Sequence, residues 1–143
     1  FSTIIMDKIT INLREHKSPD TGLFIGRPEG LAVRQNLNLD GYDQDPHAVV
    51  TFVIPEDTTA IALSFYMGLL YPSYRTLGAD GFLKKYYFEI ANKNPQVREG
   101  LEQMLKGGHR IAKNSLLSEA SIANASNQNF FRSLWRNMQL WLV

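Results

Sequence analysis

The side chains able to carry chemistry are three histidines and a group of hydroxyls and carboxylates in the middle of the chain. His16, His47 and His109 lie far apart, and none has a second histidine or a glutamate at the spacing of a helical metal site. The sequence contains no cysteine, which excludes disulfides, thiolate metal ligands and a cysteine nucleophile within it. We therefore expect neither a metal site nor a cofactor.

Glu56 and Asp57 directly follow an apolar run. At the carboxyl end of a parallel strand they could pair for acid–base chemistry; the alternative is that they are exposed loop acids near a helix start, where negative charge is favourable. Asp57, Ser64 and His109 could in principle form a hydrolytic triad, but no Gly-x-Ser-x-Gly motif accompanies the serine. We expect no enzymatic centre.

Three hydroxyls of the same region are candidates for phosphorylation: Thr58, Thr59 and Ser64. Thr58 or Thr59 could instead simply cap a helix, because a hydroxyl accepts a hydrogen bond from a free N–H of the first turn. Ser64 could instead be a helix serine bonded to its own backbone.

Basic residues suggest a second kind of contact. Arg27 and Arg34 are two helical turns apart and could hold a phosphate or an acidic partner, or could form a solvated helix face. Lys84 and Lys85 precede two tyrosines, a pattern typical of a single-strand nucleic-acid patch or of a solvated strand entry. With 15 Lys plus Arg against 14 Asp plus Glu, we do not expect nucleic acid as a partner.

The elements that must position these side chains alternate between strands and helices. Apolar patterning predicts strands at 9–13, 23–25, 48–54 and 86–90, with 48–54 buried on both faces. Helices are expected from Pro28 to about Asn36, from Thr58 or Thr59 onward, and from a cap at Asn94. The segment 38–46 is expected to be a loop. The unit from Ala48 to Ile90 should contain two parallel strands with a right-handed crossover.

Glycine and proline predict where the helices stop. Pro72 should kink or break the second helix, and residues 78–81 should form a turn. Gly107 and Gly108 should end the helix that begins near Asn94. The expected fold is α/β: a small mixed sheet with helices over residues 1–113.

The remaining residues divide into a polar connecting segment, 114–128, and an amphipathic helix, 129–143. The apolar side of that helix carries large aromatic side chains, which are candidates for binding a partner: Phe130, Phe131, Trp135 and Trp141. The alternative is that this helix packs onto the chain's own core. No run of 18 apolar residues exists in the sequence, so we expect a soluble, cytoplasmic protein without a membrane span.

One stretch, Gly26 to Arg110, resembles the STAS-like domain family of unassigned function. The resemblance rests on short motifs along the chain: Phe24-Ile25-Gly26-Arg27 with Gly30 and Arg34, Val49-Val50-Thr51-Phe52, Ser64-Phe65, Gly78 with Phe82, Tyr86 to Ile90, and Asn94 with Val97.

This resemblance implies a small α/β module without an enzymatic centre, similar to anti-sigma factor antagonists. It implies a regulatory, signalling role in which a helix-start serine is phosphorylated by a histidine-kinase-like ATPase. The surface that would bind this partner runs from Pro55 to Phe65 and includes Glu56 and Asp57. The alternative is a phage or mobile-element inhibitor, related to host defence, that sequesters a host enzyme through the aromatic C-terminal helix. The partner of that helix could also be a second copy of the chain, giving a homodimer.

Overall fold

The computed structural model describes residues 5–16 and 21–141; within the last helix it leaves out the side chains of 126, 127, 130, 131 and 133–141. The chain divides into two units, residues 1–113 and 114–143. The first unit has a mixed α/β fold, as the patterning predicts. The described residues of the second unit are helical and belong to α4 (Pro95–Trp141).

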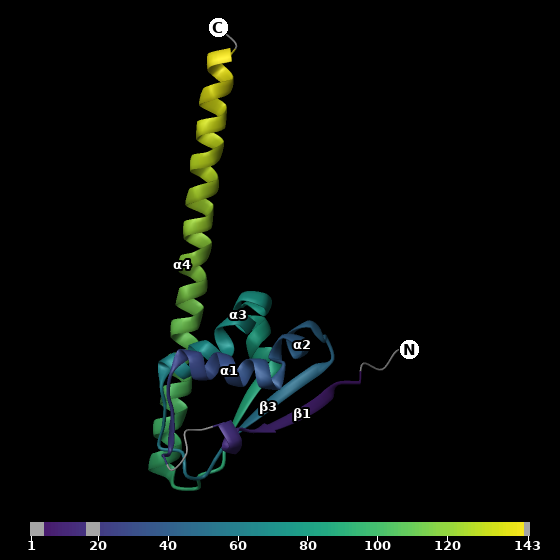
Figure 1. The fold of residues 1–143 in the computed structure, drawn as a ribbon, viewed down its shortest axis with the longest axis vertical. Helices are drawn as coiled ribbons and strands as arrows, with labels where there is room; N and C mark the ends of the chain where they lie inside the picture. The colour runs from purple at the N-terminus through teal and green to yellow at the C-terminus, as the bar shows by residue number, and fades with distance from the viewer. Residues whose placement is uncertain (1–4, 17–20, 142–143) are drawn as a thin grey trace. The chain divides into compact units, whose positions relative to one another are not determined.

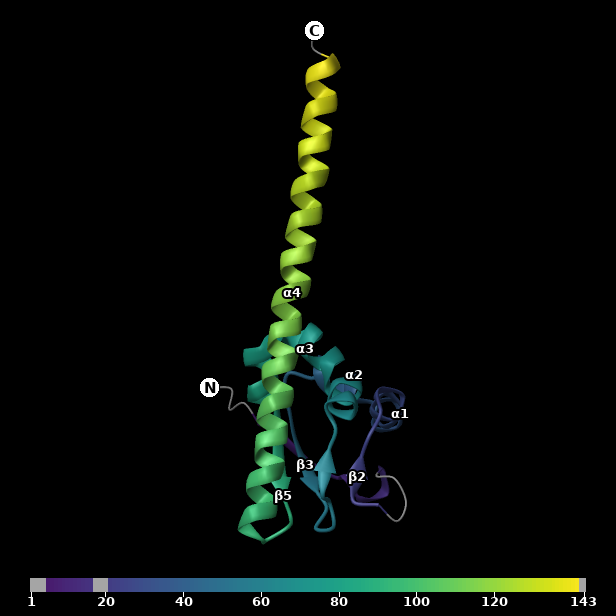
Figure 2. The same ribbon diagram turned by 90° about the vertical axis from the view of Figure 1, so that its left-hand side faces the viewer.

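Two small sheets organise the first unit (Figures 1 and 2). The larger has the order β1-β3-β5, with β3 (Ala48–Ile54) between β1 (Asp7–Asn12) and β5 (Tyr86–Ile90). The smaller pairs β2 (Leu23–Phe24) with β4 (Ala60–Ile61). All these pairs are parallel, so the expectation of a mixed sheet is wrong, whereas the parallel pairing of the strands at 48–54 and 86–90 is confirmed. Helices connect neighbouring strands of the larger sheet, as parallel pairing requires.

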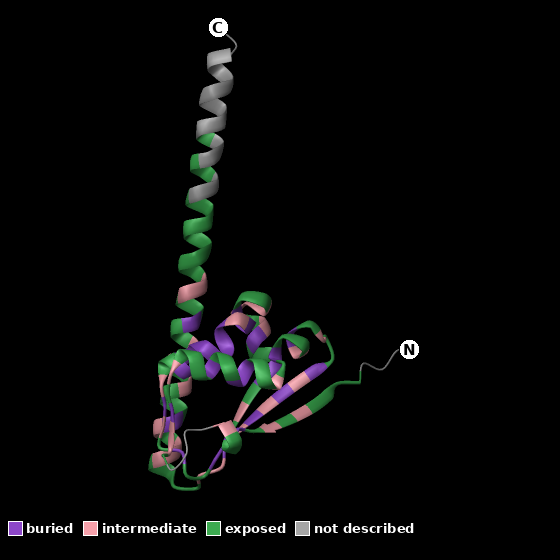
Figure 3. Ribbon diagram, viewed as in Figure 1, coloured by how far each residue is buried: buried purple, intermediate pink, exposed green. Residues whose placement is uncertain are grey.

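Only one face of β3 is fully buried. Val50, Phe52 and Ile54 are almost inaccessible, while Val49 and Val53 are half-buried, and the alternation is visible along the strand in Figure 3. The prediction of burial on both faces is therefore wrong. An unbroken apolar run does not distinguish a strand covered twice from one covered once.

The helix predicted from Pro28 to about Asn36 is confirmed, whereas the bounds of the other helices differ in part from the prediction. Between β2 and β3 lie α1 (Arg27–Leu37) and α2 (Leu39–Gln44), joined at Asn38, whose φ of 51° turns the chain. The segment predicted as a loop, 38–46, therefore holds a short helix. A 3-10 turn, η1 (Leu13–His16), follows β1.

Helix α3 (Leu63–Lys85) starts after β4 and not at Thr58 or Thr59. It passes through Pro72, and its interruption lies instead at Gly78, with φ 76° and ψ 168°. Glycine adopts a positive φ without strain from a Cβ. The prediction of a break near Pro72 is therefore wrong. The interruption at Gly78 falls instead within residues 78–81, which were predicted to form a turn.

Two glycines allow α1 and α3 to pack with their backbones in contact. A Cβ on Gly30 would overlap the carbonyl oxygen of Phe65, and a Cβ on Gly68 would overlap that of Arg27. Both glycines lie inside helices, where glycine is intrinsically unfavourable. Close packing is the reason that this unfavourable residue is tolerated there.

The N-terminus of α4 follows the sequence prediction and its C-terminal end does not. Asn94 Oδ1 accepts hydrogen bonds from the backbone N–H groups of Gln96 (2.9 Å) and Val97 (3.4 Å), with Pro95 in the first turn. The helix then continues through Gly107 and Gly108 to Trp141. At Gly108 a Cβ would lie only 2.7 Å from the ring of Tyr66, so this glycine permits close packing and does not end the helix.

Replacing Gly68 with alanine should destabilise the protein, because the added methyl group forces α1 and α3 apart. We expect the free energy of unfolding to fall by about 1–3 kcal/mol in urea titrations followed by circular dichroism. The matched control is Gly107→Ala, where a Cβ meets no atom within 4 Å; it should stabilise the helix by up to about 1 kcal/mol. Equal effects of the two substitutions would contradict the packing argument.

Candidate functional site

A cavity of about 320 Å³ lies beyond the carboxyl ends of β3 and β5. The loop after β3 contributes Glu56, Asp57, Thr58 and Thr59, and the segment from Asn92 to Leu101 closes the other side. Ligands of parallel sheets bind at this edge, since loops from neighbouring strands meet there. Glu56 and Asp57 are exposed, so this edge presents two carboxylates to an incoming molecule.

The three predicted hydroxyls differ in their access to solvent. Thr58 is only 1% exposed, and its hydroxyl has no hydrogen-bond partner among the described residues. Thr59 is exposed and its hydroxyl donates to the carbonyl oxygen of Gly22 over 3.2 Å. Neither caps a helix, because the residue preceding α3 is Ala62. A kinase could therefore reach Thr59 and Ser64 without unfolding this loop, but not Thr58.

Ser64 lies in the first turn of α3 and is exposed. Its Oγ accepts a hydrogen bond of 3.1 Å from the backbone N–H of Gly26, which directly precedes α1. The partner in this hydrogen bond lies outside the helix, whereas the alternative interpretation had the serine bonded to its own backbone. The bond instead brings the N-terminal ends of two helices to one point, where their dipoles favour negative charge.

The two predicted arginines are in opposite environments. Arg27 is exposed, at the start of α1. Arg34 is 4% exposed and binds the carboxylates of Asp40 and Asp43, each over 2.6 Å. It is neither a partner-binding group nor part of a solvated face, so both interpretations of Arg34 are wrong. The two arginines do not form a joint anion site.

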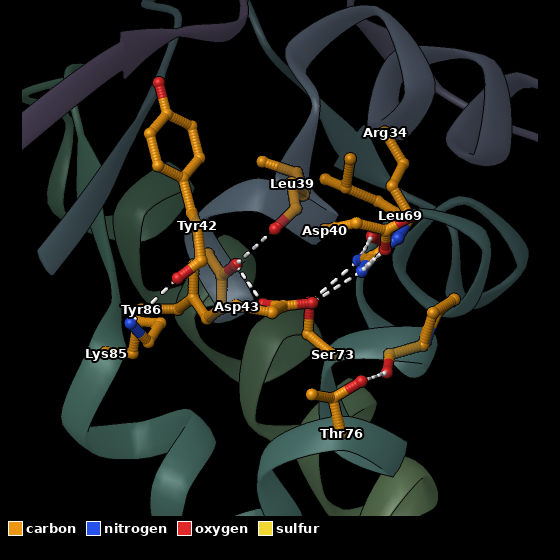
Figure 4. Close-up of polar contacts among 11 residues, drawn as sticks. Arg34, Leu39, Asp40, Tyr42, Asp43, Leu69, Ser73, Thr76, Lys85 and Tyr86 are labelled. Carbon is orange, nitrogen blue, oxygen red and sulfur yellow. Dashed lines mark hydrogen bonds and ion pairs between the residues drawn. The ribbon is translucent and has the colours of Figure 1, made fainter. Parts of the chain in front are cut away.

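Arg34 belongs to a buried network that joins α1, α2 and α3 (Figure 4). Its guanidinium also donates to the carbonyl oxygen of Leu69 (2.9 Å) and to Ser73 Oγ (2.7 Å). Ser73 in turn donates to Asp43 over 2.8 Å, and the Tyr86 hydroxyl donates to the same carboxyl group. Burial, together with Asp43, raises the pKa of Tyr86 above its usual value, so its hydroxyl remains protonated.

Lys85 is a second basic residue that was predicted to be exposed and is in fact buried. It is 8% exposed, and its ammonium group donates to the backbone carbonyls of Tyr42 (2.9 Å), Ala48 (3.1 Å) and Asp45. These bonds hold the end of α2 and the chain after it. The one sequence signal for this network is the pair Asp40 and Asp43, whose spacing of three suits one face of a helix.

Four of the predicted partner-binding residues are aromatic residues near the C-terminal end of α4. The side chains of Phe130, Phe131, Trp135 and Trp141 lie outside the described residues, although their backbone is part of α4.

The residues of the hypothetical triad are not assembled. Asp57 lines the 320 Å³ cavity, whereas His109 lines another cavity and its Nδ1 is bonded to the Tyr74 hydroxyl. Across 5–16 and 21–141, the described side chains include no cluster of three metal-ligating groups.

Comparisons with known proteins add no relative: no family model, no curated protein and no solved structure matches the chain. Among its described helices, none is long and apolar enough to cross a membrane.

Replacing Arg34 with methionine should strongly destabilise the fold, because Asp43 would remain buried without its ion-pair partner. We expect a loss of about 3–5 kcal/mol in the free energy of unfolding, measured in urea. Arg27→Met removes the same charge from an exposed position and should change stability by less than about 0.5 kcal/mol. Similar stabilities for the two variants would refute a structural role for Arg34.

Proposed function

We propose that the chain is a non-enzymatic, cytoplasmic interaction module of STAS-like type that regulates a protein partner through residues 55–65, the 55–65 surface. The observation that carries this proposal is the position of Ser64. It is exposed in the first turn of a helix that follows a parallel strand, and its Oγ accepts a hydrogen bond from the N–H of Gly26 at the start of a second helix. That is the place at which the STAS-like resemblance implies a regulatory phosphate.

The chemistry of this place suits a charge switch. A phosphate on Ser64 adds roughly −1.5 to −2 charges. The backbone N–H of Gly26 donates to this oxygen, and Ser64 lies in the first turn of α3, so the dipoles of the two helices offset part of the new charge. The fold therefore tolerates a modification that changes the surface seen by a partner.

Glu29 makes the same place sensitive to that charge. A Cβ on Gly26 would overlap the Glu29 carboxylate, so this acid lies against the residue that donates to Ser64. A phosphate on Ser64 would repel the Glu29 carboxylate. Its oxygens would also compete with Ser64 Oγ for the hydrogen bond from the N–H of Gly26. Both effects alter the start of α1 as well as that of α3. The partner that the resemblance implies is a histidine-kinase-like ATPase.

Adding a negative charge at Ser64 should weaken partner binding without unfolding the protein. We expect Ser64→Asp to lower the affinity for an ATPase that co-purifies with the full chain by about tenfold or more, measured by calorimetry, through like-charge repulsion and lost fit. The matched control is Thr76→Asp, which adds the same charge at an exposed position of α3 outside the 55–65 surface. Intact-mass spectrometry with the same ATPase should show one phosphate on the wild type and none on Ser64→Ala.

An unchanged affinity for Ser64→Asp would contradict the proposal, as would a phosphate that persists in Ser64→Ala.

A second candidate function rests on the second unit, 114–143. This unit is one helical segment, and a single helix cannot bury its own apolar side. Leu117 and Ile122 are 60% and 66% exposed, and the sequence predicts an amphipathic helix with large aromatic side chains over residues 129–143. Such a helix gains stability by packing against another surface. We infer that it could serve as the working part of an inhibitor that captures a host enzyme, or as a dimerisation helix.

Light scattering coupled to size-exclusion chromatography should separate these roles. If the helix associates with another chain, the full protein should be a dimer or larger and a chain ending at residue 127 should be a folded monomer. Circular dichroism serves as the control for folding of the shortened chain. A monomeric full chain whose shortened form unfolds would assign the helix to the protein's own core.

A further inference from the structure

Strand β1 forms an open edge of the larger sheet. It pairs on one side with β3, and Figure 1 shows it at the outer edge of the sheet. The N–H of Asp7 donates to the carbonyl oxygen of His47 over 2.8 Å, so the odd-numbered residues of β1 direct their backbone groups toward β3. The backbone N–H and C=O groups of Lys8, Thr10 and Asn12 therefore point away from the sheet, and no described residue bonds to them.

The opposite edge of the sheet, β5, is covered by the first part of α4 (Figure 2). The N–H of Ala91 donates to the carbonyl oxygen of Ile54 in β3, so the carbonyl of Ile90 faces the other way. Arg98 of α4 donates to that carbonyl over 2.8 Å. An uncovered edge strand pairs readily with another chain unless charge, proline or a bulge prevents it. Residues 9–12 of β1 carry neither charge nor proline, and their register with β3 is unbroken.

The sequence of β1 matches itself when two copies run antiparallel. Ile9, Thr10 and Ile11 read the same in both directions, as a contact across a twofold axis requires. With Thr10 on the axis, this residue faces its own copy in a hydrogen-bonded pair, because its backbone groups point outward. Ile9 then faces the partner's Ile11 in the closer, non-hydrogen-bonded arrangement, where cross-strand side chains pack best.

Charge and burial disfavour the neighbouring registers. Moving the axis one residue toward the C-terminus places Lys8 opposite the partner's Arg14, and like charges directly opposite each other are destabilising. Moving it one residue toward the N-terminus places the carboxylate of Asp7 against the partner's Ile11, an apolar side chain. In the register centred between these two, Lys8 faces the neutral amide of the partner's Asn12.

Pairing in this register would bury the apolar side of β1. Ile9 and Ile11 are half-buried and lie beside Val50 and Phe52 of β3, which are fully buried. The two isoleucines thus form the border of the core, and the partner's isoleucines would continue the same apolar row. We propose that β1 pairs antiparallel with β1 of a second copy of this chain, centred on Thr10. This contact uses neither the 55–65 surface nor the second unit.

Charges placed on the twofold axis test this pairing in the full chain. Sedimentation equilibrium should show a dimer with a dissociation constant between about 1 μM and 1 mM, the range of a small interface. Thr10→Lys and Thr10→Glu should each weaken the dimer by about tenfold or more, because each charge faces its own copy. An equimolar mixture of the two variants should restore it. The matched control, Thr76→Lys, adds a charge at an exposed position of α3 and should dimerise as the wild type does.

Amide hydrogen exchange followed by NMR locates the contact. Raising the concentration of the wild type should slow exchange at Lys8, Thr10 and Asn12, whose N–H groups face outward. Exchange at Ile9 and Ile11 should change less, since their N–H groups are already bonded to β3. A chain that stays monomeric at about 1 mM would overturn the proposal. So would a dimer that both Thr10 variants retain, which would place the contact on another surface, or a loss that mixing the variants fails to restore.

Discussion

The buried ion pair between Arg34 and Asp43 is the interaction on which the rest of the first unit depends. A charge that is 4% exposed is tolerated only if every donor finds an acceptor. The acceptors come from α2 and α3, through Asp43, Ser73 and the carbonyl of Leu69. The pair therefore determines how three helices lie together, and Tyr86 extends the network to β5.

Close packing at glycines positions other parts of the first unit. Contact between the backbones of α1 and α3, permitted by Gly30 and Gly68, brings Gly26 to Ser64 and creates the charge-sensitive helix start. Similarly, Gly108 lets α4 pack closely against the ring of Tyr66. In both cases, the absence of a side chain allows two parts of the chain to come into close contact.

Local patterns predicted the elements that are stabilised locally. The strands at 48–54 and 86–90, their parallel pairing and the Asn94 cap are confirmed, because each depends on neighbours or on the crossover that links them. The errors concern long-range contacts. A helix was not expected at 38–46, since its C-terminal end is held by Lys85 from far along the chain. The helix end predicted at Gly107 and Gly108 ignored the ring of Tyr66.

The sequence by itself determined an α/β fold without cysteine, its principal strands and the start of its last helix. The tertiary structure decided which polar residues are available. Arg27 and Arg34 have the same chemistry and lie on one helix, but Asp43 and Ser73, 9 and 39 residues away from Arg34, draw only the second into the core. Burial of a charge depends on partners that folding assembles, and no local pattern of residues records where those partners will lie.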